Sequence, residues 1–194
     1  MTVEIKVTGA TNPNPAPEPA PLPSEAGPSA QEQEQAVAAQ QAETEATSDL
    51  AALKQHAEER IDAFMVKVGY NPPERTDEAG WRYFTLGSAE GRAGAIEVEG
   101  NIFLRVEALV MPMPADKELI LPLMRELLAI NMSMSGPSRL GIKEDQVYTA
   151  LLYPVKALPD DDYATLIHWT MTLADQLDDA LIKKYGGTTI QRAD

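Results

Sequence analysis

Strict alternation of apolar residues between positions 102 and 110 constrains the fold of this chain more than any other feature. The alternating residues are Ile102, Leu104, Val106, Ala108 and Val110. A period of two predicts a β-strand that buries one of its faces. The other face of the same strand carries Phe103, Leu109 and Met111, so we expect a second layer to cover it as well.

The residues before this strand predict a hairpin. Ile96 and Val98 are separated from Ile102 by Glu99-Gly100-Asn101, which is typical of a turn. A two-residue Gly100-Asn101 turn would pair Glu97 with Leu104 and mix a charge into the apolar face. We therefore expect a three-residue loop that pairs Val98 with Ile102 and Ile96 with Leu104.

Helical periodicity flanks these strands. Apolar residues recur every three or four positions between Ser48 and Gly69, between Leu119 and Ile130, and after Pro159 as far as Gly186. Shorter strand patterns lie at 81–84, 140–142 and 147–155. The last is apolar on both faces, so we expect it to be covered on two sides. The predicted order is α-β-β-β-α-β-β-α, an α+β fold with an antiparallel sheet packed with helices.

Composition divides the chain at about residue 47. Residues 1–47 are rich in Pro, Ala, Gln and Glu and carry seven acids against the single base Lys6, which predicts a flexible acidic tail. Within this tail, Val3, Ile5 and Val7 alternate with polar residues. That pattern fits either a frayed terminus or a strand that pairs with a sheet edge. We expect one domain over 48–187 and a short C-terminal tail over 188–194.

The composition excludes several kinds of site. The chain has no cysteine and two histidines, so we expect no thiol nucleophile, no metal site, no cofactor and no catalytic residue. Its net charge of −14 disfavours direct binding to nucleic acid. The sequence contains no apolar stretch of the ~20 residues that a membrane span needs and no secretion signal. We expect a soluble, cytoplasmic protein.

Two short motifs have both a functional and a structural interpretation. The stretch from Gly87 to Gly94 lacks the Gly-Lys-Ser/Thr ending of a phosphate loop, and we interpret it as a mobile hairpin connection. The triplet 160–162 is all Asp and could bind a divalent cation, but its position favours capping of the last helix. We expect His56 on a helix surface and His168 as a packed or flanking residue.

Methionine is unevenly distributed. Five of the eight methionines fall between residues 111 and 134. Methionine fills irregular gaps in cores, and it also lines surfaces that accept varied apolar partners. Under the second interpretation, the predicted protein-binding residues are Phe103, Leu109, Met111, Met113, Leu123, Met124, Leu127, Met132 and Met134.

The second half of the chain resembles a known group of proteins. The resemblance rests on 127–131 (LLAIN), 139–142 (RLGI) followed by Glu144-Asp145, 147–153, and 158–160 (LPD) before a long final helix. These residues resemble the YbjN family and the fold of type III secretion chaperones of the Tir-chaperone kind. The resemblance covers about residues 50–187 and is strongest over 119–187. It implies a small homodimer that binds other proteins and has no catalytic residues.

These observations predict a non-catalytic, chaperone-like protein-binding module. Its apolar, Met-rich surface would bind a client protein, and its acidic surface would speed the encounter with a basic client, of which a nucleic-acid-binding protein is one class. The alternative is a dimeric regulatory or scaffold protein whose N-terminal tail recruits partners. Both interpretations predict a homodimer.

Overall fold

The computed structural model describes residues 30–134 and 136–186, and the chain divides into two compact units, Met1–Gln41 and Ala42–Asp194. The elements are α1 (Ala30–Lys67), α2 (Pro72–Arg75), β1 (Arg82–Leu86), β2 (Ala89–Val98), β3 (Asn101–Pro112), α3 (Lys117–Ser133), β4 (Arg139–Lys143), β5 (Gln146–Pro154), the 3-10 turn η1 (Val155–Ala157) and α4 (Asp162–Tyr185). Helix α1 has no end at position 47, where the composition changes. The predicted strand of Val3, Ile5 and Val7 and the predicted tail over 188–194 lie outside the described residues.

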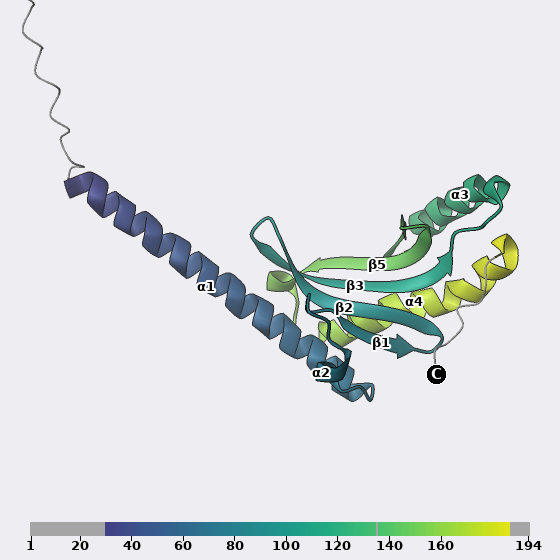
Figure 1. Ribbon diagram of the computed structural model, residues 1–194, viewed down its shortest axis with the longest axis horizontal. Helices are drawn as coiled ribbons and strands as arrows, with labels where there is room; N and C mark the ends of the chain where they lie inside the picture. Colours follow the sequence, from purple (N-terminus) through teal and green to yellow (C-terminus); the bar gives the residue numbers. More distant parts are fainter. Residues whose placement is uncertain (1–29, 135, 187–194) are drawn as a thin grey trace, which may run out of the picture. The chain divides into compact units, whose positions relative to one another are not determined.

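The strands form one antiparallel sheet in the order β1-β2-β3-β5-β4 (Figure 1). Apart from the short α2 and η1, the element order is the one that the sequence predicts, so the α+β fold class is confirmed. The turn between β4 and β5 is Glu144-Asp145, as expected, and both of its residues have positive φ.

The predicted register of the β2–β3 hairpin is wrong. Val98 pairs with Asn101 and Glu97 with Ile102, so the turn has two residues, Glu99 and Gly100. Both turn residues have positive φ, 50° and 71°, which is the geometry of the tight turns that match the twist of a hairpin. Glycine supplies this conformation readily, whereas Glu99 adopts it although non-glycine residues seldom do.

The predicted face of Met111 is also wrong. The pairing of β3 with β5 shifts between Leu109 and Met111, because Leu109 lies opposite Tyr148 and Met111 opposite Val147. Val110 is therefore the extra residue of a β-bulge, and a bulge turns the following side chain to the other face. Met111 is fully buried in the core as a result.

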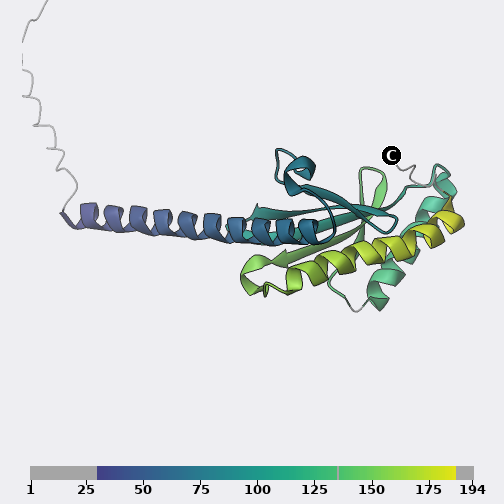
Figure 2. The ribbon, with the colours of Figure 1, turned by 90° about the horizontal axis from the view of Figure 1, so that it is seen from below.

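The core lies between one face of the sheet and the helices. Helix α4 contacts β1, β2, β3 and β5, and α3 contacts β4 (Figures 1 and 2). In the second unit, α1 places Phe64 edge-on against Phe84 of β1, with ring centroids 5.4 Å apart. Where α3 meets α4, Lys184 Nζ lies 2.5 Å from Glu126 Oε2, and this hydrogen bond is the main cause that lowers the pKa of Glu126.

The glycine-rich stretch is not a mobile connection, as we had predicted, but part of a strand. The connection between β1 and β2 is limited to Gly87 and Ser88, since Leu86 pairs with Ala89. Within β2, a Cβ at Gly91 would lie 2.3 Å from Met171 Sδ of α4. The absence of a side chain at Gly91 therefore leaves room for the end of Met171, and a Cβ there would also lie 2.9 Å from the backbone oxygen of Glu107.

The outer edge of the sheet at β4 is covered at Leu140 by a side chain. Asn131 of α3 accepts a hydrogen bond from Leu140 N–H through Oδ1 (2.8 Å) and donates one to Leu140 C=O through Nδ2 (3.0 Å). The amide of Asn131 thus takes the place that the backbone of a neighbouring strand would occupy.

Candidate protein-binding surfaces

The structure separates the predicted binding residues into three groups. Met111, Leu123 and Leu127 are buried, so they belong to the core and not to a surface. Phe103, Leu109, Met113 and Met134 are half-buried. Met124 and Met132 are exposed, with 42% and 87% of their surface accessible. For Leu123 and Leu127 the reason is that α3 is amphipathic, and they lie on its inner side.

Helix α3 presents a stripe of exposed apolar residues to solvent. We call this set the α3 stripe; it consists of Leu121, Met124, Leu128 and Met132. Steps of three and four residues place all four side chains on one side of the helix. Leu128 is 65% exposed and Leu121 56% exposed. An ordered row of this kind is typical of a surface that contacts another polypeptide.

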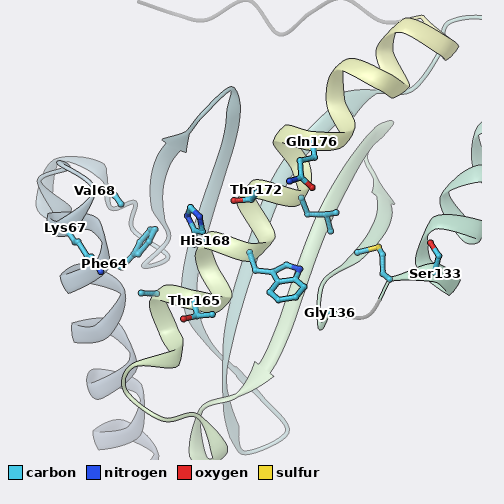
Figure 3. A pocket seen from close by; sticks show the side chains of 13 residues that line it. Phe64, Lys67, Val68, Ser133, Gly136, Thr165, His168, Thr172 and Gln176 are labelled. Carbon is cyan, nitrogen blue, oxygen red and sulfur yellow. The ribbon is translucent and has the colours of Figure 1, made fainter.

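A groove lies over the outer side of α4 (Figure 3). Its volume is about 730 Å³. One wall is the end of α1, and the other is the segment that follows α3. The lining residues are Phe64, Lys67, Val68, Ser133, Met134, Gly136, Ala164, Thr165, His168, Trp169, Thr172, Leu173 and Gln176. Of the predicted residues, Met134 lies in this groove, which we call the α4 groove.

Charge is absent from the floor of the α4 groove. Residues 163–174 of α4 include no Asp, Glu, Lys or Arg, although charged residues make up 24% of the chain. The inner side of this stretch is buried, with Tyr163, Ile167 and Met171 against the sheet. Its outer side would ordinarily be charged in a surface helix, but here it carries Ala, Thr, Leu and Trp.

Trp169 is the largest side chain of the groove, and its place depends on a glycine. The indole is 45% exposed. A Cβ at Gly136 would lie 2.6 Å from Cε2 and Nε1 of Trp169, so the ring rests directly on the backbone of Gly136. A large aromatic ring held in this way has the character of an interface anchor. Trp169 is not among the predicted binding residues, although the uncharged stretch around it is a signal for such a surface.

The sheet face away from the helices carries an ion cluster. Glu107 is 4% exposed, and its Oε2 accepts hydrogen bonds from Arg92 Nη2 (2.6 Å) and Nε (3.0 Å). Arg105 Nη2 lies 2.5 Å from Oε1, and Lys143 Nζ lies 3.9 Å from Oε2. Burial raises the pKa of Glu107, but the hydrogen bond from Arg92 and the charge of Arg105 outweigh it, so the pKa is lowered. The bases neutralise the charge of the buried carboxylate, so we interpret the cluster as a contribution to the stability of the sheet.

The sequence predicted that both faces of β5 are covered, but no second layer covers β5 on this face of the sheet within the described residues. Leu152 is 52% exposed, and Tyr148 and Ala150 are half-buried. A second cavity of about 570 Å³ lies there, lined by both acidic and basic residues, among them Arg75, Glu90 and Glu144. Phe103 and Leu109 point to this face.

The two histidines have different surroundings. His56 Nε2 lies 2.8 Å from Asp160 Oδ1, and Arg60 Nη2 lies 3.2 Å from Asp160 Oδ2, so these residues join α1 to the start of α4. His168 is exposed and lines the α4 groove. Within residues 30–134 and 136–186, no group of three or more His, Asp or Glu could hold a metal ion. None of the described helices is long and apolar enough to cross a membrane.

Comparisons with known proteins support the fold. No protein-family model matches the chain, and no curated protein matches its sequence. Among solved structures, a chain of the ExsC–ExsE complex is 14% identical, with a TM-score of 0.51 over 66% of this chain and 95% of that one. A chain of the HopA1–SchA chaperone–effector complex is 12% identical (TM-score 0.49; 65% and 95% covered). YbjN from E. coli is 14% identical (TM-score 0.43; 64% and 90% covered). The chain of the ExsC–ExsE complex, with its TM-score above 0.5, supports the predicted fold.

Proposed function

We propose that this protein is a non-catalytic, chaperone-like module that binds a client protein in the α4 groove. The observation that carries this proposal is a groove of about 730 Å³ with an uncharged α4 floor, on a domain whose core is otherwise complete. Its aromatic anchor, Trp169, lines the groove together with Met134, Leu173 and Val68, and these apolar residues can bury an apolar side chain of a partner. The similar ExsC fold was solved in complex with a second protein, ExsE, which supports the same kind of role.

Fewer methionines contribute to the proposed client surface than the sequence predicts, since Met134 lines the α4 groove and Met124 and Met132 belong to the α3 stripe. Met132, Met134 and Met124 remain accessible to a partner, whereas the buried members of the predicted set are not. The unbranched thioether side chain of methionine adapts its shape to different partners. This property suits a module that accepts more than one client sequence.

The α3 stripe favours a second contact, with another copy of the chain. More than half of the surface is exposed on each of Leu121, Leu128 and Met132. Contact with another apolar face would remove this surface from water. We propose a homodimer formed through α3, which leaves the α4 groove free for a client. A dimeric regulatory or scaffold role would use the same stripe, with the N-terminal tail recruiting partners.

Charge affects the approach of the client. The net charge of −14 attracts a basic protein over long distances, and salt weakens this attraction. We therefore propose that the client is basic overall, with nucleic-acid-binding proteins as one class. An association rate that does not fall with rising salt would contradict this part of the proposal.

A capture experiment with matched variants tests the proposed function. The full chain is incubated in a lysate and crosslinked, and the captured proteins are identified by mass spectrometry. We expect Met134→Asp to remove a defined set of captured proteins and Leu152→Asp, on the opposite sheet face, to retain it. Leu128→Asp distinguishes the role of the α3 stripe from that of the α4 groove. This substitution should dissociate the dimer and leave client capture unchanged. Equal capture by the Met134 and Leu152 variants would refute the proposal.

A further inference from the structure

The α4 groove supplies positive charge and hydrogen-bond donors but no carboxylate. No Asp or Glu is among its lining residues, although the chain has 30 acids against 16 bases. Lys67 stands on the α1 wall, and no described carboxylate forms an ion pair with it. The indole N–H of Trp169 likewise finds no acceptor among the residues that the structure describes. A partner can therefore place carboxylates in this groove, because no carboxylate among the lining residues repels them.

The shape of the groove fits a helix. The floor is a series of α4 residues from Ala164 to Gln176, which at 1.5 Å per residue extends about 18 Å. In Figure 3 the labelled side chains Thr165, His168, Thr172 and Gln176 follow one another along this floor, between Lys67 on one wall and Ser133 on the other. A partner helix of about three turns would match this length, with apolar residues at three- and four-residue spacing directed at α4.

We propose that the segment seated in the α4 groove is an amphipathic helix of a partner protein that places an acidic residue beside Lys67. This inference rests on the proposed function and names the chemistry of the bound segment. The inference does not depend on the overall charge of the client. The net charge of this whole chain determines the long-range attraction, whereas Lys67 alone makes the proposed contact with the acidic residue. The apolar side chains of the helix would contact Trp169, Met134 and Leu173.

Two labelled peptides test this inference with the full-length chain. Each has about 16 residues and the same leucine stripe; one carries Glu on both flanks of the stripe, and its twin carries Lys. Fluorescence anisotropy measures binding, and circular dichroism confirms that the two are equally helical. We expect the Glu peptide to bind more tightly. Lys67→Gln should weaken it by about two- to fivefold, the range of an exposed ion pair. Lys54→Gln, which removes an exposed ammonium elsewhere on α1, is the matched control and should have no effect.

A reversed charge in the floor gives a second test. Thr165→Glu introduces a carboxylate at an exposed position of the groove, so it should weaken binding of the Glu peptide by about two- to fivefold and spare the Lys peptide. Equal affinities for both peptides, unchanged by Lys67→Gln, would overturn the inference while leaving the proposed function intact. Failure of both peptides to bind would overturn both. If Thr165→Glu instead converts a dimer into a monomer in light scattering, the groove holds a second copy of the chain and the inference is wrong.

Discussion

Replacement of Glu107 by Gln should destabilise the domain by about 2 kcal/mol at neutral pH. The carboxylate is 4% exposed and is the common partner of Arg92, Arg105 and Lys143. Removing one member of a fully buried ion pair costs roughly 3–5 kcal/mol. The side chains of the three bases remain 26%, 38% and 47% exposed, so water can restore part of their solvation. The estimate therefore lies below that range.

The pH dependence provides the decisive comparison. Because the pKa of Glu107 is lowered in the folded state, its ionised form stabilises the fold at every pH above the ordinary value of about 4.3. This stabilisation disappears as the pH falls through the lowered pKa and the carboxylate gains a proton. The difference in unfolding free energy between wild type and Glu107→Gln should thus be full at pH 7 and shrink below about pH 4.

Urea unfolding followed by circular dichroism measures both quantities. Glu97→Gln is the matched control, since Glu97 is an exposed strand residue with no ion pair among the described residues. We expect the control to change the unfolding free energy by less than about 0.5 kcal/mol. A loss at Glu107 as small as that of the control, or a difference that is constant from pH 7 to pH 3, would show that the Glu107 carboxylate does not stabilise the fold.

Three further substitutions have clear expected outcomes. Gly136→Ala should push the indole of Trp169 out of its place, shift its fluorescence and weaken client capture by about tenfold, and unchanged fluorescence would contradict the contact. Burial raises the pKa of Tyr163, whose hydroxyl finds no hydrogen-bond partner among the described residues, so Tyr163→Phe should raise the unfolding free energy by about 1 kcal/mol in urea unfolding. Leu128→Asp should give a monomer in light scattering without loss of helix content, whereas a persistent dimer would place the contact elsewhere.

Periodicity in the sequence predicted the elements and most of the core. The inner side of the helix after Ser48 follows from its spacing, and Ala57, Ile61 and Met65 are indeed fully buried. The alternation in β3 likewise predicted buried residues from Ile102 to Val110, and all five of them are buried. Such patterns predict the structure well because burial of apolar surface is the main favourable contribution to folding.

Local backbone geometry is what the sequence could not predict. The hairpin register depends on Glu99 adopting positive φ, a conformation that its residue type disfavours. The bulge at Val110 lies in an unbroken apolar run from Ala108 to Met111, so no change in polarity marks it. Both deviations shift residues between faces, and the second removed Met111 from the predicted surface.

The proposed client surface differs in place from the Met-rich surface that the sequence predicts. Met124, Met132 and Met134 are accessible, as a Met-rich surface requires, but the groove is built largely on α4. Contacts between residues distant in the sequence create this groove, since Phe64, Met134 and Trp169 come from three separate segments. Single-sequence patterns carry no information on such proximity.

The hydrogen bonds between Asn131 and Leu140 have a consequence for how the chain avoids misassembly. The two residues are nine positions apart, so this protection is encoded within one short segment and can arise as soon as that segment folds. A foreign strand that tried to extend the sheet from β4 would have to displace both bonds at once. Fibrillar growth is thereby discouraged at this end of the sheet, even at the high local concentrations of protein synthesis.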